Sequence, residues 1–205
     1  MPRLARSLAN KFIVRTEDLE KTRAKMEALF NAGQVGLNDI EQVYSGLYLD
    51  IFTEFEITIE NLFLGLLSGS LYSRKNLIER KAKIQPVSMT RAIVFGDRAY
   101  LDWLPYRDKT IERAEVYFVD GKPFTLLTST QKSNLDEYGI IRNALAHKSD
   151  SAKKRFQKLI NGLSLLPREK SPTGFLRSRP YSASTQTQYE ITVWELIDMI
   201  KNLCG

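Results

Sequence analysis

The sequence predicts an all-α fold of five to seven helices packed around one long helix at residues 38–67. Asn38 with Glu41 three residues later is a variant of the capping box that starts a helix. No proline interrupts the segment before Ser68 and Gly69. At 1.5 Å per residue this helix would be about 45 Å long, enough to cross a domain. Its apolar residues recur at steps of mostly three or four, as a buried helical face requires: Ile40, Val43, Tyr44, Leu47, Ile51, Phe55, Ile59, Leu62, Phe63 and Leu66.

The remaining chain shows several shorter amphipathic segments between Gly-, Pro- and Ser-containing breaks. We expect residues 1–15 to form a basic N-terminal arm, and residues 16–205 to form a single helical domain. Further helices are expected at 16–30, 71–83, 108–119, 133–148, 152–163 and 187–203, a strand or helical turn at 91–95, a short extended segment near 124–127, and a mobile loop at about 166–188.

The composition is that of a globular protein, with 43% hydrophobic and 26% charged residues among 205. The single cysteine, Cys204, permits no internal disulfide and fits a reducing compartment. The longest interior apolar run, residues 61–73, is shorter than the about 20 residues that span a membrane. The N-terminus lacks the apolar core of a signal peptide. We therefore expect a cytoplasmic protein that does not associate with membranes.

Residues 140–148, IIRNALAHK, contain the one histidine of the chain, His147. Histidine is the side chain whose ordinary pKa lies near neutral pH, so it suits proton transfer there. In a helix, Arg142, Asn143 and His147 fall on one arc of about 140°. The small residues Gly139 and Ala146 share this arc, whereas Tyr138, Ile141 and Leu145 gather on the opposite side. The alternative is that Arg142 and His147 are ordinary cations at a helix C-terminus.

This pattern of Arg-Asn, three residues and His resembles the Arg-x4-His signature of HEPN domains, many of which are metal-independent RNA endonucleases. The resemblance extends over about residues 38–203, and residues 100–124 resemble the middle of that family. It implies an endoribonuclease of the toxin or defence type, without a cofactor. No zinc-ligand spacing, phosphate-binding glycine loop or Ser/His/Asp order is present in the chain.

The available groups suit RNA cleavage by attack of the 2′-hydroxyl on the adjacent phosphate. His147 is predicted to act as the acid or base, and Arg142 to hold the phosphate oxygens. Asn143 is predicted to orient the imidazole or to hold a phosphate oxygen. Because one imidazole cannot serve both ends of a bond, the resemblance also implies a homodimer in which two motif helices face each other.

Positive charge accumulates after the motif: residues 142–179 hold ten Lys and Arg residues but only Asp150 and Glu169 as acids. We expect RNA as the partner, bound in a salt-dependent way. The alternative is a solvated basic face that binds nothing. The predicted RNA-binding residues are Lys148, Lys153, Lys154 and Arg155.

Two other interpretations remain open for the domain. It is either a catalytically silent HEPN-like module that binds RNA or protein, or a toxin-like subunit silenced by an antitoxin or defence-system partner such as a nucleotidyltransferase. In the branch under that control a tyrosine stands two residues after the histidine, and here the residue is Ser149.

Two pairs of residues elsewhere also have competing interpretations. Trp103 and Tyr106 are more often core residues than platforms for nucleobases. Glu56 and Glu60 on the long helix are expected at its solvent face rather than beside Arg142.

Overall fold

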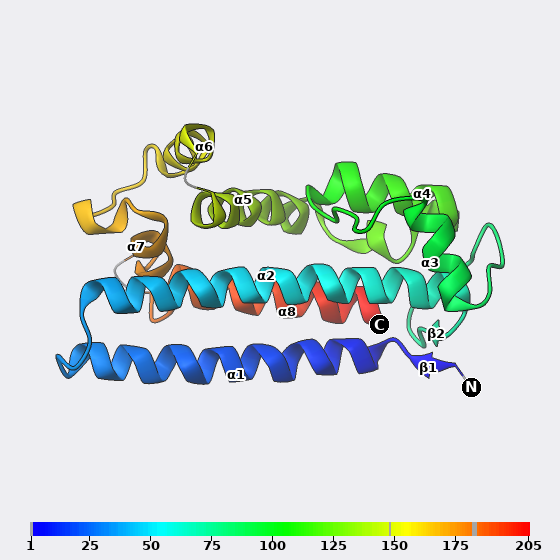
Figure 1. The fold of residues 1–205 in the computed structure, drawn as a ribbon, viewed down its shortest axis with the longest axis horizontal. Helices are drawn as coiled ribbons and strands as arrows, with labels where there is room; N and C mark the ends of the chain where they lie inside the picture. Colours follow the sequence, from blue (N-terminus) through cyan, green and yellow to red (C-terminus); the bar gives the residue numbers. More distant parts are fainter. Residues whose placement is uncertain (1, 148, 182–183) are drawn as a thin grey trace. The chain divides into compact units, whose positions relative to one another are not determined.

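The computed structural model describes residues 2–147, 149–181 and 184–205, and it is all-α (Figure 1). Within these residues the α-helices are α1 (Arg6–Asn31), α2 (Leu37–Ser68), α3 (Val87–Phe95), α4 (Glu112–Tyr117), α5 (Ser129–Ala146), α6 (Asp150–Ile160), α7 (Pro172–Arg177) and α8 (Gln188–Cys204). The π-helix η1 (Tyr106–Ile111) precedes α4 directly, and the 3₁₀ turns are η2 (Val119–Gly121), η3 (Phe124–Leu126) and η4 (Pro167–Glu169). The predicted fold class is confirmed.

The long helix expected at 38–67 is the continuous helix α2. The last helix, expected at 187–203, is α8, and its start has a capping box. The backbone N–H of Thr187 donates to Glu190 Oε2 (2.7 Å), and the N–H of Glu190 donates to Thr187 Oγ1 (3.3 Å). Both helices were correctly located from their regular apolar patterns. The expected cap at Asn38 is wrong: α2 begins at Leu37, and Asp39 accepts from the Gly36 N–H (2.8 Å).

The chain divides into two compact units. The first consists of Met1–Ile13, Glu54–Asp136 and Leu196–Gly205, and the second of Val14–Thr53 and Glu137–Glu195. The motif residues Arg142, Asn143 and His147 therefore belong to the second unit. The single domain expected from residue 16 to 205 stays a prediction.

An aromatic cluster around Phe63 of α2 lies in the core of the first unit. The ring of Phe63 lies 5.2 Å from Trp103, 5.2 Å from Phe118 and 5.4 Å from Phe124. Trp103 and Tyr106 are both buried, so the prediction that they pack in a core is confirmed. Glu60 is not at a free solvent face as expected: it accepts from Arg91 Nη1 (2.6 Å) and from Trp103 Nε1 (3.3 Å).

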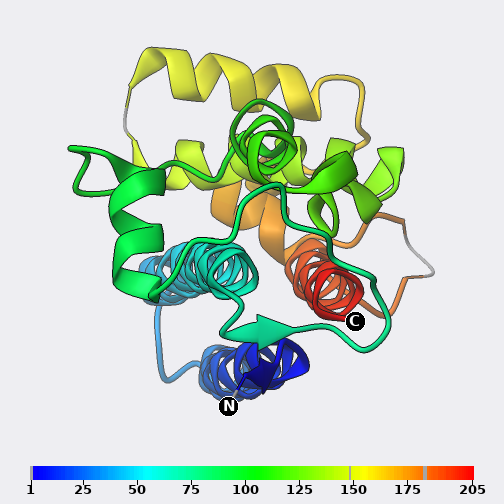
Figure 2. The ribbon, with the colours of Figure 1, turned by 90° about the vertical axis from the view of Figure 1, so that its right-hand side faces the viewer.

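The expected basic arm at residues 1–15 is wrong for its described part. Strand β1 (Arg3–Leu4) pairs in parallel with strand β2 (Leu71–Tyr72), as Figure 2 shows, and α1 begins at Arg6. Phe12 is 1% exposed and its ring packs edge-on against Phe55 at 6.3 Å. The basic composition suggested an arm, but burial of its few apolar residues holds the segment as helix.

Three further expectations in these regions are corrected. The helix expected at 71–83 is replaced by β2 and a loop, whose Lys81 N–H donates to the Tyr117 carbonyl (2.9 Å). The extended segment expected near 124–127 is the 3₁₀ turn η3, with Phe124 buried in the aromatic cluster. The loop expected at 166–188 contains η4 and α7, because proline is favoured at the first positions of a helix as well as in loops.

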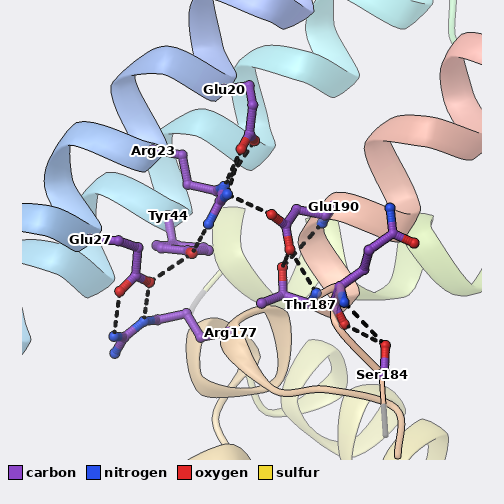
Figure 3. A network of polar contacts seen from close by, with 9 residues as sticks. Glu20, Arg23, Glu27, Tyr44, Arg177, Ser184, Thr187 and Glu190 are labelled. Atoms are coloured by element: carbon purple, nitrogen blue, oxygen red, sulfur yellow. Dashed lines mark hydrogen bonds and ion pairs between the residues drawn. The ribbon is translucent and has the colours of Figure 1, made fainter.

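The second unit contains α1 from Val14 onward, the linker at residues 32–36, α2 up to Thr53, α6, α7 and the adjoining parts of α5 and α8. Its aromatic contacts include Tyr44 with Tyr189 (5.5 Å) and Phe156 with Phe175 (6.1 Å). A network of buried and half-buried polar groups accompanies them (Figure 3). In it Tyr44 accepts from Arg23 Nη1 (3.1 Å) and donates to Glu27 Oε1 (2.8 Å), while Arg177 Nε donates to the same oxygen (3.0 Å).

Candidate functional site

The motif helix α5 begins at Ser129, four residues before the expected cap Ser133. Thr128 and Gln131 cap it reciprocally: Gln131 N–H donates to Thr128 Oγ1 (3.1 Å), and Thr128 N–H donates to Gln131 Oε1 (3.0 Å). This is the Thr/Gln form of the capping box, which satisfies two backbone donors at once. The longer helix leaves Asp136 and Glu137 in its interior.

At its other end, α5 closes at Ala146, and His147 follows directly. The backbone N–H of His147 still donates to the Asn143 carbonyl (2.9 Å), so His147 lies one helical turn after Asn143. Tyr138 and Ile141 are buried, as the apolar side of the helix required. The structure thus shows the buried apolar side of the motif helix and the one-turn spacing of Asn143 and His147.

The three predicted catalytic side chains differ in exposure and in their partners. Asn143 and His147 are exposed, whereas Arg142 is half-buried. Arg142 Nη1 donates to Asn143 Oδ1 (3.0 Å). The Asn143 oxygen is thus engaged by Arg142, and the described residues show no hydrogen bond from its amide to His147. The geometry makes Asn143 a partner of the guanidinium rather than of the imidazole.

A cavity of about 240 Å³ lies at this end of α5. Asn143 and His147 contribute to its wall, and Arg155 of α6 contributes a cation. Arg142 is not among the lining residues. The structure thus brings the imidazole together with one of the predicted RNA-binding residues, while the predicted phosphate-binding arginine lies beside the cavity. Among the described residues the wall consists of Ile140, Asn143, His147, Ser149, Ser151, Ala152 and Arg155.

Helix α6 begins at Asp150, two residues before the expected position. The Ser149 side chain caps it by accepting from the Ala152 N–H (3.3 Å). The apolar face with Phe156 and Ile160 is buried, which turns the opposite face outward. The predicted RNA-binding residues Lys153, Lys154 and Arg155 are all exposed, whereas Lys148 lies outside the described residues.

Ser149 and Ser151 in the cavity wall were not identified from the sequence as site residues. Both serines lie at the break between α5 and α6, where Ser149 caps α6. Their place beside His147 depends on the direction in which the chain leaves α5, and no sequence signal specifies that direction. The same holds for Arg155, whose charge was recognised but whose contribution to the His147 cavity was not.

The polar network of Figure 3 borders a larger cavity of about 850 Å³ in the second unit. Arg23, at 9% exposed, pairs with Glu20 and with Glu190 (2.6 Å), and Arg177 pairs with Glu27 (3.0 Å). Burial raises the pKa of Tyr44 to about 12, so its hydroxyl stays neutral. Because each buried charge here already has an opposite partner, the network favours no particular ligand and is best explained as structural.

Among the described residues no group of three or more His, Cys, Asp or Glu side chains has an arrangement that could hold a metal ion. In the same part of the chain no helix has the length and apolar character needed to cross a membrane.

Comparison with known proteins yields no matching family model, no matching curated protein and no matching solved structure. The interpretation of the site therefore depends on the residues themselves.

Proposed function

We propose that this chain is a metal-independent RNA endonuclease of the HEPN type, acting as a toxin or in defence. The observation that carries the proposal is the cavity at the end of α5, where exposed His147 and Asn143 lie with the cation Arg155. RNA cleavage through the 2′-hydroxyl requires a group that transfers protons and cations that bind the phosphate. An imidazole suits the first role, and arginine suits the second.

In the proposed reaction the 2′-oxygen of a nucleotide attacks its 3′-phosphate. The new bond joins this oxygen to phosphorus, the bond from phosphorus to the 5′-oxygen breaks, and the products are a 2′,3′-cyclic phosphate and a 5′-hydroxyl. His147 takes the proton from the 2′-hydroxyl or gives one to the leaving 5′-oxygen. Arg142 neutralises the charge on the non-bridging oxygens, with its guanidinium positioned by Asn143 (3.0 Å).

One imidazole per chain leaves the other end of the scissile bond without an acid or base. A homodimer through the motif helix would supply a second His147. The surface of α5 favours close approach, since Ala146 is exposed and a Cβ built on Gly139 would meet no atom within 4 Å. The exposed residues Lys153, Lys154 and Arg155 of α6 would hold the RNA strand beside the cleft.

The proposal is tested by incubating the purified protein with single-stranded RNA in the presence and absence of EDTA. We expect cleavage in both, because the chain offers no evident set of metal ligands in its described part. End analysis should give 2′,3′-cyclic phosphates and 5′-hydroxyls. Activity that EDTA abolishes and magnesium or manganese restores would contradict the mechanism. In cells, expression should arrest growth, and His147→Ala should relieve the arrest.

One observation favours the second candidate, a catalytically silent module that binds RNA or protein. Arg142 is half-buried, engaged by Asn143 and absent from the wall of the cavity that holds His147. Intact RNA after incubation with both wild type and His147→Ala, together with tight, salt-sensitive binding, would support this candidate and overturn the nuclease.

A further inference from the structure

A second basic site lies in the first unit, in the loop between α3 and η1. There a cavity of about 480 Å³ is bordered by the charged residues Arg98, Asp102, Lys109 and Arg113 and by Tyr100. Ala99 and Leu101 complete its wall. None of these residues belongs to the motif of α5 or to the basic face of α6.

Buried neighbours fix the shape of this loop. Leu101 and Trp103 are buried, and Thr110 Oγ1 donates to the Trp103 carbonyl. Arg113 Nη1 donates to the Asp102 carbonyl (3.1 Å), and its guanidinium lies 4.6 Å from the centre of the Trp103 ring. Arg113 is therefore held against the core and at the same time belongs to the cavity wall.

The cations of this cavity form no ion pair at contact distance, although the Asp102 side chain also belongs to the cavity wall. Among the described residues no carboxylate lies within ion-pair distance of Arg98, Lys109 or Arg113, whereas the nearby Arg91 pairs with Glu60 at 2.6 Å. Burial lowers the pKa of Arg113, and the positive charge of Arg98 lowers it further. Asp102 in the cavity wall and Glu60 nearby offset part of this positive charge at Arg113. An anion that binds among the three cations reduces the repulsion that remains between them.

Tyr100 gives the cavity an aromatic surface next to its cations. It is 76% exposed, unlike Trp103 and Tyr106, which are buried in the core. An exposed ring beside arginines is the arrangement that stacks a nucleobase while the cations hold its phosphate. The volume lies within the about 300–1,000 Å³ typical of small-molecule sites, which suits one nucleotide.

We propose that this cavity binds a nucleotide unit, with its phosphate among Arg98, Lys109 and Arg113 and its base on Tyr100. The unit is either a free mononucleotide or one nucleotide of an RNA strand, since both present the same phosphate and base. The site is independent of the proposed nuclease activity, because it uses none of the residues assigned to cleavage.

The chain offers a built-in reporter for this site. It has two tryptophans, and Trp194, at 63% exposed, can be replaced by phenylalanine so that Trp103 alone fluoresces. The experiment titrates the Trp194→Phe protein, in a low-salt buffer without phosphate, with AMP, adenosine, inorganic phosphate and a 2′-O-methyl RNA octamer. The 2′-O-methyl groups prevent cleavage through the 2′-oxygen, so binding is measured by itself. Calorimetry provides a second readout.

We expect AMP and the octamer to change Trp103 emission saturably, and adenosine to bind at least about tenfold more weakly because it lacks the phosphate. The double variant Arg98→Gln with Lys109→Gln should weaken AMP binding by at least about tenfold. Tyr100→Ala should weaken AMP by about tenfold but leave inorganic phosphate unchanged. The matched control, Arg74→Gln with Lys81→Gln, removes two exposed cations of the same unit and should change neither.

The two sources of nucleotide are separated by affinity, since AMP will bind as tightly as the octamer if the site takes mononucleotides and more weakly if it takes a strand. Equal affinities for the wild type and the Arg98/Lys109 double variant would overturn the proposal. So would the absence of binding in both fluorescence and calorimetry. His147→Ala should leave this binding intact, so nucleotide binding without RNA cleavage would overturn only the proposed nuclease.

Discussion

At the scale of single residues, His147 and Arg142 have different duties in the proposed reaction. His147 is exposed in its cavity and transfers protons, so His147→Ala should lower cleavage by about 10²- to 10⁴-fold. Its RNA affinity should stay nearly unchanged, because the phosphate contacts of the RNA are assigned to the lysines and arginines and not to His147. Single-turnover cleavage and fluorescence anisotropy measure the two quantities. Equal cleavage by wild type and variant would remove His147 from the mechanism.

The contribution of Arg142 to the cleavage rate is expected to depend on the shape of its guanidinium as well as on its charge. Arg142→Lys should remain as slow as Arg142→Ala, since an ammonium group cannot replace the planar fork that meets Asn143 and a phosphate. If the lysine variant cleaves like wild type, a point charge suffices and the positioning by Asn143 has no role.

The lowered pKa of Glu27 in the polar network leads us to expect that the stability of the fold depends on pH. Burial by itself would raise the pKa of Glu27, but hydrogen bonds from Arg177 and Tyr44 outweigh it and hold the pKa below its ordinary value. A carboxyl whose pKa is lower in the folded state stabilises the fold above its unfolded pKa, and this stabilisation is lost as the pH falls through the folded pKa. The network should therefore weaken on acidification.

The test compares the denaturant unfolding of wild type and Glu27→Gln. At pH 7 the variant should be less stable by about 1–3 kcal/mol, and the difference should shrink between about pH 5 and pH 3. Glu17→Gln, at an exposed position of α1, makes the same change of charge and serves as the control. A difference that is constant over this range would show that the ionised form of Glu27 does not contribute.

At the scale of elements, α6 separates into a buried face with Phe156 and an exposed basic face. Replacing Lys153, Lys154 and Arg155 with glutamine should weaken RNA binding and lower the slope of log K against log salt by about two to three units. Replacing Arg6, Lys11 and Lys25, three exposed cations of α1, removes the same charge as a control. If both triple variants lose affinity equally, the binding follows net charge and α6 is not the binding surface.

At the scale of the whole molecule, the proposed enzyme is a homodimer. Ala146 is exposed, so Ala146→Trp should leave the monomer folded but obstruct the approach of a second motif helix. The variant should then lose both dimerisation, measured by analytical ultracentrifugation, and nuclease activity, measured by RNA cleavage. Ala24→Trp, an equally large change at an exposed position of α1, should affect neither. A fully active monomer of the wild type would contradict the composite cleft.

Much of the helical framework was predictable because its signals are local. The apolar patterns of α2 and α8 each identify a helix without reference to the rest of the chain. The helix at the motif was also predictable, since helical spacing alone brings Asn143 and His147 within one turn. Where the pattern was weak, as before Phe12, basic composition suggested an arm and burial against Phe55 overrode it.

The sequence by itself determined the helical class, the long helix and the chemistry available at the end of α5, because these depend on residue type and on spacing along one helix. The tertiary structure alone decided which groups from different elements meet: Arg155 with His147 in one cavity, and Arg98 with Lys109 and Arg113 in another. It also decided that Glu60 binds Arg91 and Trp103. The physical reason is that such encounters depend on how loops direct the chain, and a pattern within one segment carries no information about that direction.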